Sequence, residues 1–340
     1  MITILILGFL FGATLQYARL NKFNVISGLA VREDFTVPKA IALAVGIGAI
    51  LLNFEIALGF ASYHVKPLII GGIVLGGLIF GMGMAILGYC PGTMAVSLGE
   101  GSMDALMGLL GGLAGGVVYT FLLPQLQPVL GPNLGDLSLQ SVVSNRVLFF
   151  ILLLILAAVF VFLAFWLHRI DKNKERKWIV AGIVLAFLDV AVFSKWLSNR
   201  PIGASTSYPY LGDFLTGVTQ NGYFTAIKTS GHWELIFLTG AFSAGLVISL
   251  IKKEFKFVLV HKNWLRFKGA SPLKRIVWAF VGGFILIFGA RMAGGCTSGH
   301  ILSGGMQLAF SSLIFAIFVF IGLLVTGQFF YKPGKNSKTD

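Results

Sequence analysis

Residues 88–93, Gly-Tyr-Cys-Pro-Gly-Thr, interrupt a long apolar run and hold one of only two cysteines in the 340-residue chain. The second cysteine, Cys296, lies in a similar interruption, Gly-Gly-Cys-Thr-Ser-Gly-His, at residues 294–300. Proline removes a backbone donor, and glycine permits backbone angles that a helix does not use, so both stretches predict broken helices. The same kind of break therefore occurs once in each half of the chain, each time with a cysteine.

The composition places these breaks in a membrane protein. Hydrophobic residues make up 56% of the chain and charged residues only 11%, whereas a soluble globular domain carries about 25% charged residues. We therefore predict an all-α polytopic membrane protein. The net charge of +13 would indicate nucleic acid in a soluble protein, but here Lys and Arg gather in short loops that meet lipid headgroups. Membrane lipids are expected partners, and nucleic acid is not.

A window of about 20 residues, the length that crosses the hydrocarbon core, gives about nine candidate spans. They run roughly over residues 2–17, 40–60, 67–89, 103–123, 147–167, 178–197, 233–251, 276–295 and 307–330. The first run has no basic residues before it and no convincing cleavage site after it. We interpret it as a retained helix.

The charged loops predict the orientation. Residues 168–177 and 252–275 are rich in Lys and Arg and are therefore expected in the cytoplasm, whereas 124–145 and 198–232 are poor in them and are expected outside. Alternation of the spans then puts the N-terminus outside and the basic tail, residues 332–340, in the cytoplasm.

In that orientation the third span runs inward and ends at Cys90, whereas the eighth runs outward and ends at Cys296. Spans one to four and six to nine therefore predict an inverted-topology repeat with re-entrant half-helices, an arrangement common among transporters. A chance likeness between Gly-rich stretches is the alternative. The predicted parts are a first repeat (1–123), a connector with the fifth span (124–177), a second repeat (178–331) and the tail (332–340).

The breaks favour a site for an anion. Pro91 suits the first position of a helix, and Thr297 or Ser298 is expected to cap a second one. Helix N-termini attract anions and lower the pKa of a nearby thiol, so two of them together would form an anion site lined with sulfur. Arg291, inside an apolar span, is either part of this site or a structural side chain. Both cysteines have the simpler alternative of being small buried residues, and a disulfide between them stays open.

Two longer segments contain these motifs, GMGMAILGYCPGTMAVSLGEGSMDALMGLLGGLAGG (81–116) and GGFILIFGARMAGGCTSGHILSGGMQLAFSS (282–312). They resemble the two cysteine-bearing signatures of the YeeE/YedE family of sulfur-compound transporters, whose characterised members import thiosulfate. RPIGASTSYPYLGDFLTG (200–217) and LTGAFSAGLVISLIKKEFKF (238–257) also resemble the second half of the family pattern. The resemblance covers most of the chain except the connector.

The resemblance implies an hourglass-shaped protein of the bacterial inner membrane, with about nine spans and half-helices that dip toward its waist. Thiosulfate would pass along a line of cysteines through weak S–H···S contacts, and Cys90 and Cys296 match two of them. Asn24 stands where the family often has a third cysteine, and an amide offers hydrogen bonds but no polarizable sulfur. A related sulfur or selenium anion would therefore fit as well.

We expect uptake of thiosulfate or a related small sulfur anion, without catalytic residues, metal or cofactor. The alternatives are transport of another sulfur or selenium species, or a membrane thiol–disulfide redox protein, although the sequence displays no Cys-x-x-Cys motif. His300 is expected either to tune the thiol or anion or to be a hydrogen-bonded structural residue. The predicted pathway residues are Asn24, Cys90, Pro91, Gly92, Thr93, Arg291, Gly295, Cys296, Thr297, Ser298, Gly299 and His300.

The resemblance also suggests a protein partner, a small cytoplasmic sulfur-carrier protein that accepts the delivered sulfur. The basic loops at 169–177 and 252–275 are its expected docking surface. Membrane topology alone also produces basic loops, and this simpler explanation stays open.

Overall fold

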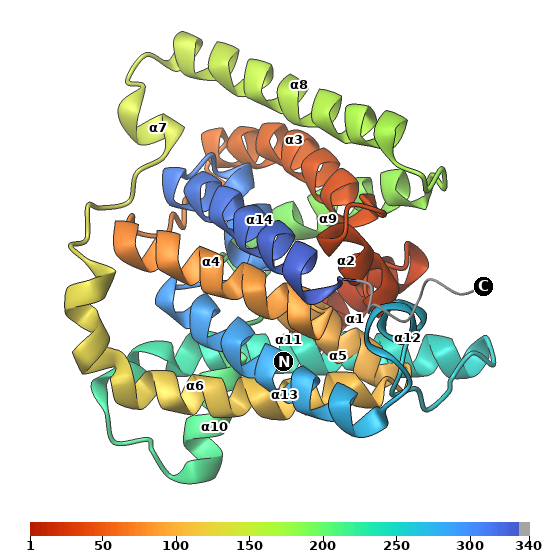
Figure 1. The fold of residues 1–340 in the computed structure, drawn as a ribbon. Helices are drawn as coiled ribbons and strands as arrows, with labels where there is room; N and C mark the ends of the chain where they lie inside the picture. The colour runs from red at the N-terminus through yellow and green to blue at the C-terminus, as the bar shows by residue number, and fades with distance from the viewer. Residues whose placement is uncertain (333–340) are drawn as a thin grey trace.

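The computed structural model describes residues 1–332, which form a bundle of helices (Figure 1). A long helix stands at each predicted span: α1 (Ile2–Tyr17), α3 (Thr36–Ala57), α4 (Ile70–Leu87), α6 (Met103–Leu130), α8 (Arg146–Ile170), α9 (Lys177–Phe193), α11 (Gly222–Ile251), α13 (Pro272–Met292) and α14 (Phe310–Phe330). The predicted tail, apart from Lys332, lies outside the described residues. The fold class is all-α, as predicted.

Seven stretches within residues 1–332 are long and apolar enough to cross a membrane, and the stretch Ile70–Gly99 combines α4 with the short helix α5 (Pro91–Gly99). Helices α1 and α9 have 16 and 17 residues and are shorter than the other long helices. Helices of this length and hydropathy make the chain a polytopic membrane protein.

The predicted connections contain more helix than the hydropathy indicates. Helix α11 begins at Gly222 and not at Trp233, and α10 (Ser207–Thr216) lies inside the predicted connection 198–232. Helix α6 continues past Leu123 to Leu130, and α7 (Leu139–Val142) follows it. These boundaries were predicted wrongly because hydropathy ends a span at the first polar or proline-containing turns, whereas backbone hydrogen bonding continues through them.

The order of elements in the first part of the chain recurs in the second. A long helix, a short helix, two long helices, a half-helix and a final long helix appear first as α1, α2 (Phe23–Ala30), α3, α4, α5 and α6. They appear again as α9, α10, α11, α13, the π-helix η1 (Thr297–Gly304) and α14, with α12 (Lys262–Lys268) added between α11 and α13. In the sequence, helix α8 separates the two sets. In the structure it lies at the edge of the bundle and packs against α3 (Figure 1).

Packing follows the same repeat. Helix α13 packs on α6, and its counterpart α4 packs on α14; α1 packs on α11, and α9 packs on α3. Helices α4 and α13 also pack on each other at the centre. Glycines permit this closeness: a Cβ on Gly283 of α13 would overlap the carbonyl oxygen of Gly108 on α6. Each set of helices therefore buries its faces largely against the other set.

The two basic loops contact the same stretch of chain at the start of α3. In the first loop, Asn173 donates to Thr36 Oγ1 (3.3 Å), and Asp171 pairs with Lys39 at 2.6 Å. In the second, Arg266 of α12 pairs with Glu33 at 2.7 Å. Both loops thus contact residues 33–39, and they share one face of the bundle, as expected of two loops on the same side of a membrane.

Candidate functional site

Both cysteine breaks have the same backbone construction. Gly88 and Gly294 each lie two residues before a cysteine and adopt left-handed conformations, with φ of +81° and +73°. Cys90 and Cys296 are then the extended cap residues of α5 and η1. The predicted breaks are confirmed, and Pro91 takes the first helical position as expected. The expected capping by Thr297 or Ser298 is wrong, because the helix has already begun at Thr297.

Each half-helix is anchored through a serine seven residues beyond its cysteine. Ser97 of α5 donates to the carbonyl oxygen of Asn21 at 2.5 Å, and Ser303 of η1 accepts from the Ile202 N–H at 3.1 Å. Asn21 and Ile202 belong to the segments that follow α1 and α9. The two breaks therefore have equivalent supports.

The two thiols come together from the two repeats. The Cys90 thiol accepts a hydrogen bond from Thr93 at 3.3 Å, and Thr297, the neighbour of Cys296, lies beside it. The Cys296 sulfur lies 3.2 Å from Ser298 Oγ. Both cysteines are free, and both pack in the main buried core of the bundle. The structure contains no disulfide between them.

Tyr208 of α10 completes this centre and escaped prediction. Its hydroxyl donates to the carbonyl of Pro91, the residue after Cys90, at 3.0 Å. Gly92 is packed closely, since a Cβ there would stand 3.3 Å from the ring of Phe11. The sequence offers a weak signal for Tyr208, its place in the Ser-Thr-Ser-Tyr-Pro stretch at 205–209.

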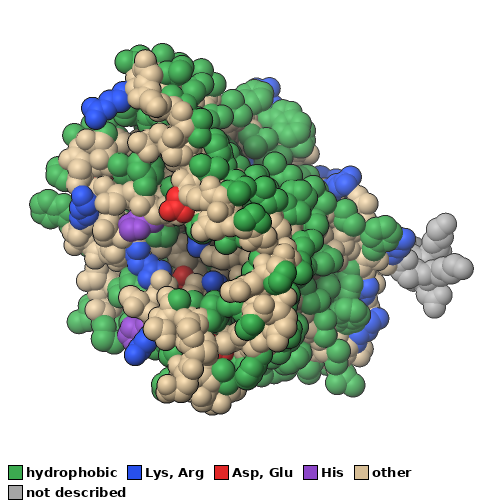
Figure 2. All heavy atoms as spheres, turned by 90° about the vertical axis from the view of Figure 1, so that its left-hand side faces the viewer, with side chains coloured by type: hydrophobic (Ala, Val, Ile, Leu, Met, Phe, Trp, Pro, Cys, Tyr) green, Lys and Arg blue, Asp and Glu red, His purple; other side chains and the backbone are tan. Residues whose placement is uncertain are grey.

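Next to Cys296 lies a group of charged side chains, Lys66, Arg200, Glu234 and Arg291, which we call the cationic vestibule. Arg291 is 7% exposed and donates to Tyr223 (2.8 Å), Ser205 and Thr206. Glu234 pairs with Arg200 at 3.5 Å. Figure 2 looks onto this end of the bundle and shows Lys, Arg and acidic side chains within a hollow of the surface.

Lys66 belongs to the loop between α3 and α4, and no sequence signal distinguishes it. Its ammonium donates to the Gly294 carbonyl at 2.6 Å. The predicted residues Gly295 and Gly299 leave space for it: their Cβ atoms would stand 3.0 and 3.9 Å from Lys66 Nζ. Burial, followed by the nearby Arg291 charge, lowers the pKa of Lys66. A cation is thus held over the residues that flank Cys296.

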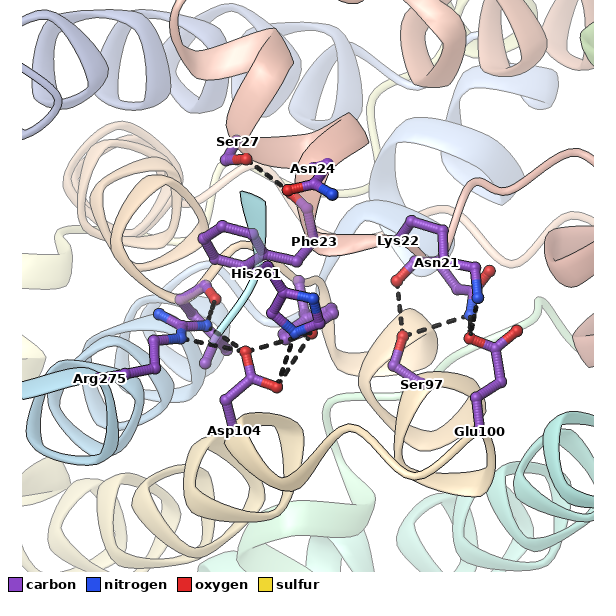
Figure 3. A network of polar contacts seen from close by, with 12 residues as sticks. Asn21, Lys22, Phe23, Asn24, Ser27, Ser97, Glu100, Asp104, His261 and Arg275 are labelled. Carbon is purple, nitrogen blue, oxygen red and sulfur yellow. Dashed lines mark hydrogen bonds and ion pairs between the residues drawn. The ribbon is translucent and has the colours of Figure 1, made fainter. Parts of the chain in front are cut away.

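The opposite end of the site holds a second set of polar residues, Tyr89, Asp104, His261 and Arg275, which we call the Asp104 network (Figure 3). Arg275 pairs with Asp104 at 2.6 Å, and neither side chain is exposed. Tyr89, the neighbour of Cys90, hydrogen-bonds to Asp104 (3.2 Å) and to His261 (3.0 Å). The network joins the Cys90 break to the basic loop 252–275.

Two predicted residues lie apart from the thiols. The Asn24 side chain accepts from the Asn263 N–H at 3.0 Å and helps to hold α12. His300 is fully buried, with its two ring nitrogens hydrogen-bonded to Ser312 (3.1 Å) and to the Ala293 carbonyl (2.8 Å). Of the two expectations for His300, the structural one matches these contacts.

Comparison with known proteins agrees with this architecture. A family model described as sulphur transport matches residues 17–325. The thiosulfate transporter TsuA of Spirochaeta thermophila is 25% identical over 334 residues, which cover 94% of this chain and 95% of that protein. The chain therefore belongs to the sulphur transport family, YeeE/YedE.

Proposed function

We propose that the protein takes up thiosulfate, or a related small sulfur anion, across the bacterial inner membrane, along a path on which Cys296 and Cys90 are successive contacts. The family and the thiosulfate transporter of S. thermophila support the substrate class. The observation that carries the proposal is the pair of free cysteines, each at the start of a half-helix and each from a different repeat.

Thiosulfate combines hard oxygens with one soft terminal sulfur. The N–H groups and positive ends of α5 and η1 suit the oxygens, and the polarizable thiols suit the sulfur. A thiol is a weak hydrogen-bond donor, so each contact holds the anion only briefly. Conduction requires such shallow binding, because a deep site would trap the anion.

The direction follows from the basic loops, which we place in the cytoplasm. The Asp104 network, joined to loop 252–275, then faces inward and the cationic vestibule faces outward. From Arg275 to Arg291, α13 rises about 24 Å, at about 1.5 Å per residue. In this orientation the anion meets the vestibule, Cys296 and Cys90 in turn. The N-terminus lies outside, and the repeats divide at residues 123, 177 and 331.

The shared face of the two basic loops supports a further part of the proposal, a cytoplasmic sulfur-carrier protein that binds there. Lys172, Lys174 and Arg266 are exposed on this face. Pull-down of such a carrier by the solubilised protein, weakened when these three residues are changed to Glu, supports the docking surface. Equal binding by the triple variant contradicts it.

Uptake of radiolabelled thiosulfate into proteoliposomes tests the proposed function. Saturable uptake above that of empty liposomes supports it, and absence of uptake by folded protein contradicts it. Replacing both cysteines with serine separates transport from the alternative of a redox protein. A serine hydroxyl still donates hydrogen bonds, so a transporter retains some flux, whereas a dithiol enzyme loses all turnover.

A further inference from the structure

Two cations of the vestibule have no acidic partner. The hydrogen-bond acceptors of Arg291 are the hydroxyls of Tyr223, Ser205 and Thr206, and Lys66 donates to a backbone carbonyl. Within residues 1–332 neither side chain forms an ion pair. Arg291 is buried and Lys66 is half-buried. A charge removed from water without a counter-charge is costly, above all for Arg291, so this pair of cations favours a bound anion.

The one acid of the vestibule is already engaged. Glu234 pairs with Arg200 at 3.5 Å, and its other oxygen accepts from the Thr206 N–H at 2.6 Å. Arg200 also lies over the Trp233 ring at 4.3 Å. Glu234 therefore balances Arg200, and the positive charges of Lys66 and Arg291 remain in excess.

The internal repeat supplies a comparison. At the Cys90 break, Arg275 donates to the carbonyls of Ile86 and Leu87 at the end of α4, as Lys66 donates to Gly294 just beyond the end of α13. Arg275 is neutralised by Asp104, the second residue of α6. The second residue of α14 is Ser311, whose hydroxyl donates to the Lys66 carbonyl at 2.8 Å. The Cys90 break thus has an acid, Asp104, beside its cation, whereas the Cys296 break has the neutral Ser311 at the equivalent position.

We propose that Lys66 and Arg291 form an oxyanion-binding site that receives the sulfonate oxygens of the substrate and leaves its terminal sulfur for Cys296. The identity of the substrate rests on the proposed function, but the site itself requires only a small tetrahedral oxyanion. Gly295 and Gly299 let the Lys66 ammonium lie over the residues that flank Cys296. The sulfonate oxygens are therefore bound in the cationic vestibule, and the terminal sulfur is the first part of the anion to reach Cys296.

Kinetics of thiosulfate uptake test this assignment. Lys66→Met and Arg291→Gln are expected to raise the apparent KM about tenfold or more, since a hydrogen bond to a charged group contributes about 1.5–3 kcal/mol. Lys195→Met is the matched control: Lys195 is exposed at the same end of the bundle and also donates to a carbonyl, that of Gly59 at 2.9 Å. Its KM should stay within about twofold of wild type.

Sulfate, which has the oxygens but no terminal sulfur, is the diagnostic probe. It should compete with thiosulfate in wild type, compete about tenfold less in Lys66→Met, and not be transported. Equilibrium binding of labelled sulfate to the solubilised protein separates this proposal from the proposed function, because binding that requires Lys66 supports the site even if no thiosulfate is taken up. Unchanged KM and unchanged sulfate binding in correctly folded Lys66→Met protein would overturn the assignment.

Discussion

At the scale of single residues, the site depends on two glycines that permit each chain break. Gly88 and Gly294 have positive φ, which costs an L-amino acid about 1–2 kcal/mol. Gly88 carries a second constraint, because a Cβ would overlap the ring of Phe23. That ring is 1% exposed and stacks on His261, with centroids 5.0 Å apart. The break therefore requires glycine both for its backbone and for its neighbour.

Gly88→Ala is expected to destabilise the protein by about 2–5 kcal/mol, the sum of the backbone cost and overpacking against Phe23. Gly59 is the matched control, because it has φ of +83° but no atom within 4 Å of a Cβ. Gly59→Ala should cost only about 1–2 kcal/mol. Unfolding in detergent measures both variants, and equal losses would contradict the packing role of Phe23.

The pH dependence of uptake reports on Lys66. Its pKa is lowered by burial and then by Arg291, while Glu234 and the Cys296 thiol act in the opposite direction. The charged ammonium binds the anion, so affinity is present below this lowered pKa and is lost as the pH rises through it. Arginine stays charged throughout, so Lys66→Arg should keep its affinity at alkaline pH. If wild type and Lys66→Arg lose affinity equally as the pH rises, the titrating group is not Lys66.

At the scale of elements, hydropathy and the Gly and Pro breaks were sufficient to predict the long helices and the interruptions at Cys90 and Cys296. They were not sufficient for α10 or for the first turns of α11, where Lys228 and His232 make the sequence polar. Lys66 was missed for a different reason. A single lysine in a short loop carries no local signal, and its role depends on contact with Gly294, far away in the sequence.

The pair Arg275–Asp104 fixes the start of α13 against α4 and α6. Both side chains are fully buried, so Arg275→Met, which leaves Asp104 without its partner, should cost about 3–5 kcal/mol. The exposed pair Lys177–Glu175, at 3.8 Å, is the control, and Lys177→Met should cost less than about 1 kcal/mol. Chemical unfolding in detergent compares them. A small loss for Arg275→Met would show that the network does not support the fold.

At the scale of the whole molecule, the predicted repeat explains the order of the helices and their paired packing. The sequence alone could not show which helices meet, because apolar spans have many compatible neighbours in a membrane. The centre formed by Cys90, Thr297 and Tyr208 depends on those contacts. Its residues come from both repeats, so their proximity is a property of the assembled bundle.

Single cysteines test the orientation of the bundle. In a background with Cys90→Ala and Cys296→Ala, Lys228→Cys should react with a membrane-impermeant maleimide on intact cells, whereas Lys172→Cys should react only after permeabilisation. Both lysines are exposed, so accessibility depends on the side of the membrane. The opposite labelling pattern would invert the proposed direction of the path.

The central claim is that the two thiols act in series on one path. The most direct measurement is initial thiosulfate uptake by Cys90→Ala, Cys296→Ala and the double variant, with Thr239→Ala, an exposed position on α11, as control. We predict that each single cysteine variant loses most of the uptake and that the control matches wild type. The double variant should take up thiosulfate no more slowly than the slower of the two single variants. Wild-type uptake by either folded cysteine variant would contradict the account.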